Sequence, residues 1–338
     1  MDSPAHRRLP VPAVPSGPGF RTGSNRPGRD ARLGTVMPVT SGVRLSGKRR
    51  TTAAAAGQGD IDPGPREADD AVQVIWGSFT DLGRFRRVNE DALLAAPPAF
   101  VVSDGMGGHA AGDVAAAIVI EEFGATIDSG SRVGSEWVLR CIHRAGARIR
   151  AGAGGGATVV GAAIVEQDGE SYWLAFNIGD SRIYRCSGGE LTQISVDHSY
   201  VQELVEDGRL QREQMRRHPR GNVITRAVGL VGDGDPDCWL IPAREGERLL
   251  LCTDRVTGEL ADVEVADVLA SHIDPQLAAE ALVTAALAAG GRDNATAVVI
   301  DVLTVSGNAS DEATVGHPEP GTGDDLDRTW RPGKGGQT

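Results

Sequence analysis

Short apolar runs separated by turn residues dominate the middle of the chain. Eight such runs are rich in Val, Ile, Leu and Ala, and glycines such as Gly169 and Gly188 stand between them. Short apolar runs bounded by turn residues are typical of β-strands. The pattern therefore predicts strands at 72–80, 91–96, 99–104, 157–166, 172–179, 182–186, 246–254 and 294–302.

Longer segments with helical spacing lie between these runs. We expect helices near 110–126 and 134–151, and a third at 275–289. Asp274 is suited to cap the third helix, and Pro275 occupies its first position, where a missing N–H is tolerated. The apolar stripe of this helix is expected to comprise Leu277, Ala281, Leu282 and Ala285.

The order of these elements indicates the fold class. Most strands follow one another directly, the helices come in separate blocks, and a polar stretch at 198–220 suits short exposed helices. Regular alternation of strands and helices would instead favour a doubly wound parallel sheet. The order predicts an α+β sandwich over about 70–303.

Charge is distributed unevenly along the 338 residues. The formal net charge is −12, but residues 1–59 hold ten of the 34 Lys and Arg residues and two of the 46 Asp and Glu residues. This segment is rich in Pro and Gly and lacks apolar periodicity, so we expect a disordered basic extension at 1–69. The Gly- and Pro-rich segment 304–338 is expected to be a second disordered tail.

Composition also excludes several classes of protein. A basic extension can contact nucleic acid or anionic lipid, but we favour a plain extension, or a start of translation at Met37 or later.

The sequence has no run of about 18 apolar residues and no apolar stretch of a secretory signal, so no membrane insertion is expected. The four cysteines form no C-x-x-C pair, which disfavours zinc ribbons and suits a reducing compartment.

Carboxylates recur beside glycines and apolar runs at the expected strand ends. The four places are Glu90–Asp91, Asp104–Gly105, Asp254 and Asp293–Asn294. Each alone is commonly a turn or a strand cap. Several converging carboxylates repel one another unless they share a cation, and ligands that are all oxygen select hard ions such as Mg²⁺ or Mn²⁺. Two such ions close together can activate a water and clamp a phosphoryl group.

Eight ordered motifs carry a resemblance to a known family. They are R-x-x-x-E-D (86–91), D-G-M-G-G-H (104–109), G-x-T (156–158), I-G-D-S-R (178–182), D-H-S (197–199), I-T-R-A-V-G (224–229), C-T-D (252–254) and G-x-D-N (291–294). In this order they resemble the bacterial metal-dependent Ser/Thr protein phosphatases of the protein phosphatase 2C (PPM) family. The resemblance covers about residues 72–302.

The resemblance implies a fold and a metal centre. The fold would be two packed antiparallel β-sheets flanked by helix pairs, an α-β-β-α sandwich that forms a catalytic domain at 70–303. Two Mg²⁺ or Mn²⁺ ions would lie at one end, with Asp104 bridging them. The implied ligands are Asp91, Asp104, the Gly105 carbonyl, Asp254 and Asp293.

The resemblance also assigns roles around the metals. Arg86 would grip the substrate phosphate, because a guanidinium fork matches phosphate oxygens, and Glu90 would orient a metal-bound water or bind at the edge. Asp180 would support a weaker third metal site. His109 could act as a proton donor, but we favour a structural role for it at the start of a helix. The stretch 199–221 corresponds to a flap that shapes substrate access.

The implied reaction is direct hydrolysis of phosphoserine and phosphothreonine in proteins. A metal-activated water attacks phosphorus in line, and the metals and Arg86 take up the developing charge. No cysteine nucleophile is needed, so Cys252 is expected to pack in the core, and His198 to order the segment after it. The partners would be phosphorylated proteins, including substrates of Ser/Thr kinases or the kinases themselves. We expect a cytoplasmic monomer with no nucleic-acid partner.

One residue departs from the family pattern beside the proposed metals. Arg255 follows the C-T-D motif, where the family normally has glycine, and can compete for Asp254 or contact phosphate. Ala157, where threonine is usual, is a milder change. Two hypotheses remain: an active phosphatase, favoured because all four aspartates are present, and a catalytically weak regulatory or binding module. A phosphatase domain of an anti-sigma pathway is disfavoured, because the sequence shows no sensor domain.

Overall fold

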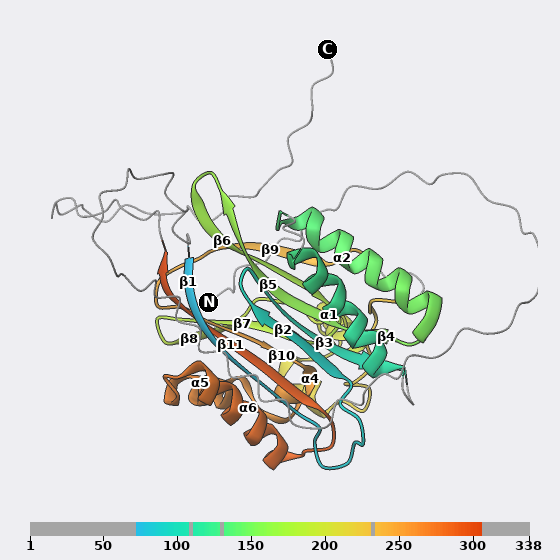
Figure 1. The fold of residues 1–338 in the computed structure, drawn as a ribbon. Helices are drawn as coiled ribbons and strands as arrows, with labels where there is room; N and C mark the ends of the chain where they lie inside the picture. Colours follow the sequence, from blue (N-terminus) through green and yellow to red (C-terminus); the bar gives the residue numbers. More distant parts are fainter. Residues whose placement is uncertain (1–71, 108–110, 129–131, 231–233, 306–338) are drawn as a thin grey trace, which may run out of the picture. The chain divides into compact units, whose positions relative to one another are not determined.

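Two antiparallel sheets form the centre of the protein, as seen in a computed structural model that describes residues 72–107, 111–128, 132–230 and 234–305 (Figure 1). The first sheet has the order β1-β11-β10-β7-β8, and all its neighbours are antiparallel. Its strands are β1 (Val72–Asp81), β7 (Arg182–Ser187), β8 (Glu190–Gln193), β10 (Arg248–Cys252) and β11 (Ala295–Val305).

The second sheet has the order β2-β3-β5-β6-β9 and is also antiparallel, with the short β4 paired to β3. Its strands are β2 (Asp91–Ala96), β3 (Ala99–Met106), β4 (Gly156–Ala157), β5 (Val159–Gln167), β6 (Glu170–Ile178) and β9 (Asp237–Pro242).

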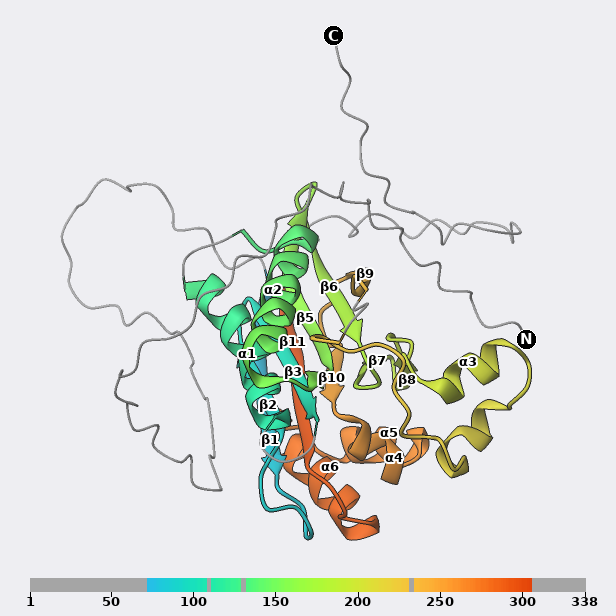
Figure 2. The same cartoon turned by 90° about the vertical axis from the view of Figure 1, so that its right-hand side faces the viewer.

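Helices cover the outer faces of both sheets (Figures 1 and 2). On the second sheet lie α1 (Gly112–Asp128) and α2 (Ser135–Arg148), which continues into the π-helical turn η1 (Ile149–Ala153). On the first sheet lie α4 (Asp254–Glu259), α5 (Asp262–Ser271) and α6 (Pro275–Ala289). Two short helices, α3 (Tyr200–Glu206) and the 3₁₀ turn η2 (Arg212–Arg217), stand at the side.

The alternation of side chains along the strands builds three layers of core. In β3, Phe100 and Val102 belong to the cluster between the two sheets. Their neighbours Ala99 and Val101 face the opposite way and pack under α1 and α2. Because successive strand residues point to opposite faces, a strand with both faces covered must be apolar throughout. This explains the unbroken apolar runs in the sequence.

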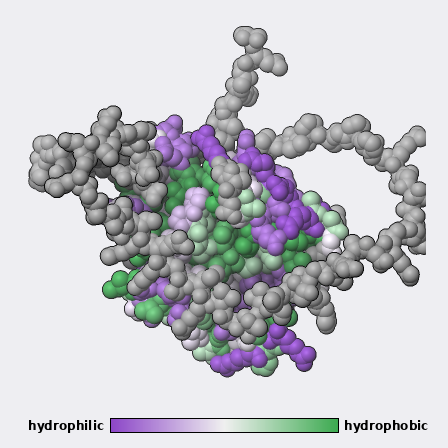
Figure 3. Space-filling model, in the orientation of Figure 1, coloured by the Kyte–Doolittle hydropathy of each residue, from purple (hydrophilic) through white to green (hydrophobic). Residues whose placement is uncertain are grey.

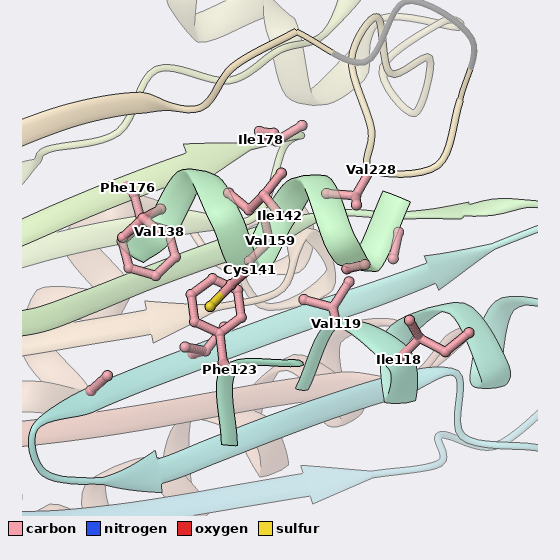
Figure 4. Close-up of a cluster of buried hydrophobic side chains, with 14 of the residues drawn as sticks. Ile118, Val119, Phe123, Val138, Cys141, Ile142, Val159, Phe176, Ile178 and Val228 are labelled. Atoms are coloured by element: carbon pink, nitrogen blue, oxygen red, sulfur yellow. The ribbon is translucent and has the colours of Figure 1, made fainter. Parts of the chain in front are cut away.

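The α2 helix shows the amphipathic pattern that a covering helix requires. Its buried residues recur at helical spacing and include Trp137, Cys141 and Ala145. Its outer face carries charged residues, and Figure 3 shows hydrophilic side chains gathered along it. Beneath the helix, the ring of Phe123 stacks on that of Phe176 with centroids 5.4 Å apart, in the cluster drawn in Figure 4.

The predicted fold class is confirmed, and most predicted elements are present. The structure adds β8, β9, α4 and α5, which the sequence pattern did not reveal. The strand expected at 246–254 ends at Cys252, because α4 begins at Asp254. β11 runs to Val305, so two residues assigned to the tail belong to a strand. The predicted N-terminal extension, 1–69, and the rest of the predicted C-terminal tail, 306–338, lie outside the described residues.

The predicted apolar stripe of α6 is confirmed at Leu282 and Ala285 and is wrong at Leu277. Asp274 does cap the helix, accepting from the amides of Gln276 and Leu277. Leu277, however, is 54% exposed. The residues that pack inward are Pro275, Ala278, Ala279, Leu282, Val283 and Ala286. A helix made almost entirely of Ala, Leu and Val has little contrast between its faces, so its periodicity defines the buried stripe poorly.

No helix among the described residues is both long and apolar enough to span a membrane.

Gly161 gives a direct test of the packing under α2. It lies opposite Phe176 in the β5–β6 pair, and a Cβ built there would overlap the buried Phe176 ring. We expect Gly161→Ala to lower the free energy of unfolding by about 1–3 kcal/mol, because the stacked ring has no room to move. Urea unfolding followed by circular dichroism measures the change.

Gly124 in α1 provides the matched control for this substitution. A Cβ at that position meets nothing within 4 Å. Gly124→Ala should therefore raise the free energy of unfolding by about 0.5–1 kcal/mol, through helix propensity alone. Equal stability of Gly161→Ala and the parent protein would contradict the proposed close packing.

Candidate active site

Two aspartates of the second sheet lie directly opposite each other. Asp91 at the start of β2 and Asp104 in β3 are register partners. Like charges at opposite positions of an antiparallel pair are destabilising. The sequence predicted a strand that ends at Asp104, but β3 continues to Met106. The pair is therefore held rigidly inside a sheet and needs a positive partner to be stable when ionised.

The first sheet contributes the other two predicted aspartates from adjacent strands. Asp254 is the first residue of α4 and follows β10 by one residue, and Asp293 lies just before β11. Strands β10 and β11 pair antiparallel, so the end of β10 lies beside the start of β11. Both carboxylates therefore lie at the same end of these two strands. Folding thus brings together residues that are far apart in the sequence.

Two threonines connect the aspartates of the two sheets. Thr296 in β11 donates to Asp91 Oδ2 at 2.6 Å, and Thr253, which precedes α4, donates to the same oxygen at 3.2 Å. Both threonines are buried; Thr296 lies in the first sheet and Thr253 directly follows its strand β10, whereas Asp91 belongs to the second sheet. The sequence alone indicated no role for either threonine, although Thr253 stands inside the C-T-D motif.

Burial and the charges of neighbouring aspartates both raise the pKa values of these carboxyl groups. Burial raises the pKa of Asp91 to about 7, with contributions from the charges of Asp254 and Asp293, although the threonine hydrogen bonds oppose the shift. Burial, followed by the charges of Asp91 and Asp254, raises the pKa of Asp104 well above its usual range. A buried cluster whose members resist ionisation is an environment that favours a cation.

Asp180, the predicted ligand of a third metal, lies in the turn between β6 and β7 and is subject to the charges of the same aspartate cluster. It is buried, and its pKa is raised well above the usual range by burial and then by the charges of Asp254 and Asp197. Its own charge acts on Asp104 in turn. The structure therefore places Asp180 within electrostatic reach of Asp104 and Asp254.

Arg86 and Glu90 lie at the rim of this cluster. Arg86 holds both oxygens of Asp293, with Nε 2.7 Å from Oδ1 and Nη2 2.8 Å from Oδ2. Its Nη1 donates to Glu90 Oε2 at 3.0 Å. The Arg86 side chain is 45% exposed. Its guanidinium group therefore contacts the candidate metal ligand Asp293 and is also accessible from solvent.

Asn294 fixes the loop that carries Arg86 and Glu90. Its Oδ1 accepts from the Glu90 amide at 2.8 Å, and its Nδ2 donates to the carbonyls of Leu82 and Val88 at 2.9 and 3.2 Å. The buried amide thus ties residues 82–90 to the start of β11. This explains why asparagine follows Asp293 in the motif.

Gly105 and Thr158 position Asp104. A Cβ at Gly105 would overlap the Gly112 carbonyl at the start of α1, so only glycine allows the helix to approach the strand this closely. Thr158 Oγ1 accepts from the Asp104 amide at 3.0 Å, and its own amide donates to the Asp104 carbonyl at 2.8 Å. The backbone of Asp104 is therefore held from both sides.

Arg255 lies inside the cluster. Its Nη2 is 3.7 Å from Asp254 Oδ2 and 3.5 Å from Asp293 Oδ2. The guanidinium charge lowers the pKa of Asp254 but does not overcome burial, which comes first and leaves that pKa raised. The sequence identified this arginine as a departure, and the structure shows that its charge is directed at two candidate ligands.

The donor set suits a hard divalent ion. Across 72–107, 111–128, 132–230 and 234–305, no three His, Cys, Asp or Glu side chains are close enough to hold an ion as they stand. The contacts of Asp254 and Asp293 give a reason, because their oxygens face Arg86 and Arg255. The candidates nevertheless offer only oxygen atoms whose negative charge the arginines compensate in part, and oxygen ligands of this kind are those that Mg²⁺ and Mn²⁺ prefer.

His198 orders the backbone next to Asp180. Its Nδ1 accepts from the Gly179 amide at 3.0 Å, and its own amide donates to the Gly179 carbonyl at 2.8 Å. The His198 Nε2 atom lies 3.2 Å from Asp237 Oδ2 and 2.7 Å from Arg226 Nη1. These contacts make His198 a structural residue, but its ring holds Gly179 and Asp237 and not the segment after it, which was the expectation from the sequence. His109 lies outside the described residues.

A family model described as protein phosphatase 2C matches residues 86–289, which is more than half of the chain. The chain belongs to the protein phosphatase 2C family. The match spans Arg86, Asp104 and Asp254, so most of the site described above lies within it.

Named relatives of this protein phosphatase 2C chain are bacterial. It is 32% identical to the serine/threonine phosphatase stp of Listeria welshimeri over 239 residues, which cover 66% of this chain and 93% of the relative. It is 35% identical to the serine/threonine protein phosphatase PstP of Mycobacterium tuberculosis over 244 residues, covering 68% of this chain and 45% of PstP.

Solved structures of the family share the fold. A crystal structure of the Mycobacterium tuberculosis phosphatase PstP/Ppp matches 68% of this chain and 99% of its own, with a TM-score of 0.62 and 32% identity. The PstP catalytic domain in complex with two manganese ions matches with a TM-score of 0.61 and 31% identity, covering 68% of this chain and 99% of its own.

Arg216 tethers the predicted flap to the helix that begins at Asp254. Its Nη2 donates to the Glu259 carbonyl at 2.7 Å and its Nε to the Gly258 carbonyl at 3.3 Å, both at the end of α4. We expect Arg216→Ala to increase hydrogen exchange of amides 207–221 about tenfold or more, because the tether is lost. Mass-spectrometric exchange measures this. Arg217→Ala, at the exposed neighbouring position, is the control, and an equal effect of both would contradict a specific tether.

Asp237 gives a pH-dependent test of the His198 network. Although burial would raise it, hydrogen bonds from His198 and Arg226 lower the pKa of Asp237 to about 2 from an ordinary 3.8. A lowered carboxyl pKa contributes stability that is complete above about pH 4 and is lost as the pH falls towards 2.

The substitution that isolates this contribution is Asp237→Asn. We expect it to lower the free energy of unfolding by about 1–2 kcal/mol at pH 7, and the difference from the parent protein to shrink below about pH 4. Urea unfolding at a series of pH values measures the difference. Asp207→Asn, at a carboxylate 64% exposed, serves as the control. A difference for Asp237→Asn that stays constant down to pH 3 would rule out the proposed linkage.

Proposed function

We propose that the chain hydrolyses phosphoserine and phosphothreonine in proteins by metal-dependent attack of water. The observation that carries this is the convergence of Asp91 and Asp104 from one sheet with Asp254 and Asp293 from the other, within a family whose named bacterial members are serine/threonine phosphatases. Family membership supports the reaction class, and the buried carboxylates support its dependence on a cation.

The four aspartates are the proposed ligands of two Mg²⁺ or Mn²⁺ ions, with the Gly105 carbonyl as a further ligand. When bound, the ions would neutralise charge and lower the pKa of a water so that it can attack phosphorus. Asp104, fixed by Thr158 and placed opposite Asp91, is the proposed bridging ligand. Asp180 is the proposed support of a weaker third site.

Arg86 is the proposed phosphate-binding residue. Its guanidinium group is nearly half exposed and already binds a carboxylate through two of its nitrogens. The same planar fork fits two oxygens of a phosphate group. Glu90, which accepts from Arg86 Nη1, would keep the guanidinium oriented while Asp293 serves as a ligand.

A catalytically weak regulatory or binding module is the second candidate function. Arg255 favours it, because its charge is directed at Asp254 and Asp293. We place it second, since all four aspartates are present and Asp91 and Asp104 remain in register across β2 and β3.

We also propose where and on what the protein acts. Its substrates would be proteins phosphorylated on serine or threonine, including the kinases themselves, and it would act as a cytoplasmic monomer. All four cysteines have free thiols, and Cys141 and Cys252 are buried. This supports a reducing compartment.

The function is tested by hydrolysis of p-nitrophenyl phosphate and of a phosphothreonine peptide. We expect Mn²⁺-dependent activity that is lost with EDTA and restored by Mn²⁺. Asp254→Asn should lower kcat/KM at least about 100-fold, because it removes a proposed ligand. Asp267→Asn, at an exposed position in α5, should leave activity unchanged. Absence of activity in the parent protein at millimolar Mn²⁺, or full activity of Asp254→Asn, would refute the proposal.

A further inference from the structure

Arg255 provides an internal counter-ion for two carboxylates from different strands. Its Nη2 lies 3.7 Å from Asp254 Oδ2 and 3.5 Å from Asp293 Oδ2. The side chain is 18% exposed, so its charge acts in a partly desolvated site, where electrostatic interactions are stronger than in water. One positive charge therefore stands where two proposed ligands of a divalent ion converge.

The bonding of this guanidinium group is incomplete. Both carboxylate distances exceed those of a charge-assisted hydrogen bond, and the contact of Nη1 with Glu259 Oε1 is 3.9 Å. Its Nε is buried without a hydrogen-bond partner among the described residues. Arg86, in contrast, holds the same Asp293 at 2.7 and 2.8 Å. Arg255 compensates charge without being locked in place.

We propose that Arg255 is a displaceable counter-ion that weakens the divalent-metal site formed by Asp254 and Asp293. The inference rests on the proposed function, because it takes those aspartates as ligands. A hard divalent ion coordinates carboxylate oxygens directly, whereas Arg255 contacts them only loosely. Binding of the ion must therefore overcome the charge of Arg255 or move it away. The pair Asp91 and Asp104 has no such contact with Arg255 among the described residues.

The same charge has a second consequence in the protein without metal. Asp254 and Asp293 lie at neighbouring strand ends and repel each other, and Arg255 is a cation that contacts both. Removal of its charge should make the metal-free fold less stable while it strengthens metal binding. Loss of a counter-ion should therefore lower the stability of the metal-free protein and raise its metal affinity. Loss of a residue that only packs should lower stability without raising metal affinity.

The experiment is calorimetric titration of Mn²⁺ into the metal-free full-length protein, together with thermal unfolding in EDTA. Arg255→Gln removes the charge and keeps most of the side-chain length. We expect it to tighten Mn²⁺ binding at the site of Asp254 and Asp293 about tenfold or more, equivalent to about 1.4 kcal/mol, and to lower the melting temperature in EDTA. Arg255→Gly should tighten the site in the same direction, which provides a second neutral variant.

Two controls keep the charge argument specific. Arg255→Lys retains the charge and should bind Mn²⁺ within about threefold of the parent protein. Arg140→Gln removes a charge from α2, at a side chain 59% exposed, and should change neither Mn²⁺ affinity nor melting temperature. Unchanged or weaker Mn²⁺ binding by both neutral variants would overturn the inference, as would equal tightening by Arg255→Lys.

Failure of the inference is distinguishable from failure of the proposed function. Mn²⁺-dependent phosphatase activity with unchanged affinity in Arg255→Gln would overturn the inference alone. Tighter Mn²⁺ binding by Arg255→Gln, with no phosphatase activity in any variant at saturating Mn²⁺, would overturn the proposed function and support the inference.

Discussion

Repulsion among buried carboxylates is the constraint on which the rest of the site depends. Asp91 and Asp104 face each other across a strand pair, and Asp254 and Asp293 meet them from the other sheet. A folded chain tolerates such a cluster only if protons, internal cations or bound ions offset the charge. The raised pKa values of Asp91 and Asp104 and the two nearby arginines are responses to this same constraint.

The sandwich makes the cluster rigid enough to be useful. Each of the four aspartates lies in a strand or within two residues of one. Helices cover the outer face of both sheets, so the strands pack apolar residues on both faces. Hydrogen bonds from Thr296 and Thr253 to Asp91 join the sheets at the site itself. A backbone fixed in this way lets the carboxylate side chains turn towards an ion without ordering the chain again, which preserves affinity.

The sequence predicted the fold class and the residues of the cluster, because both depend on local pattern. It missed elements whose pattern is weak: α4 begins at Asp254 without a strong apolar period, and β9 follows a stretch of polar residues and glycines. It also missed the roles of Thr253, Thr296 and Thr158. A threonine that donates to a carboxylate across two sheets has no signature in one chain, because the partner is set by packing. The error at Leu277 in α6 has another origin, because a helix rich in Ala, Leu and Val has little contrast between its faces.

Arg255 shows why the site must be considered as a charge balance and not as a set of ligands. An isolated arginine beside an aspartate is an ordinary surface pair of small energetic effect. Here it is mostly buried, and it contacts two of the four carboxylates, one of which, Asp293, is also held by Arg86. An internal guanidinium group and a divalent ion are then alternative solutions to one electrostatic problem. A chain that carries both must distribute the same negative charge between them, and its metal affinity reflects that competition.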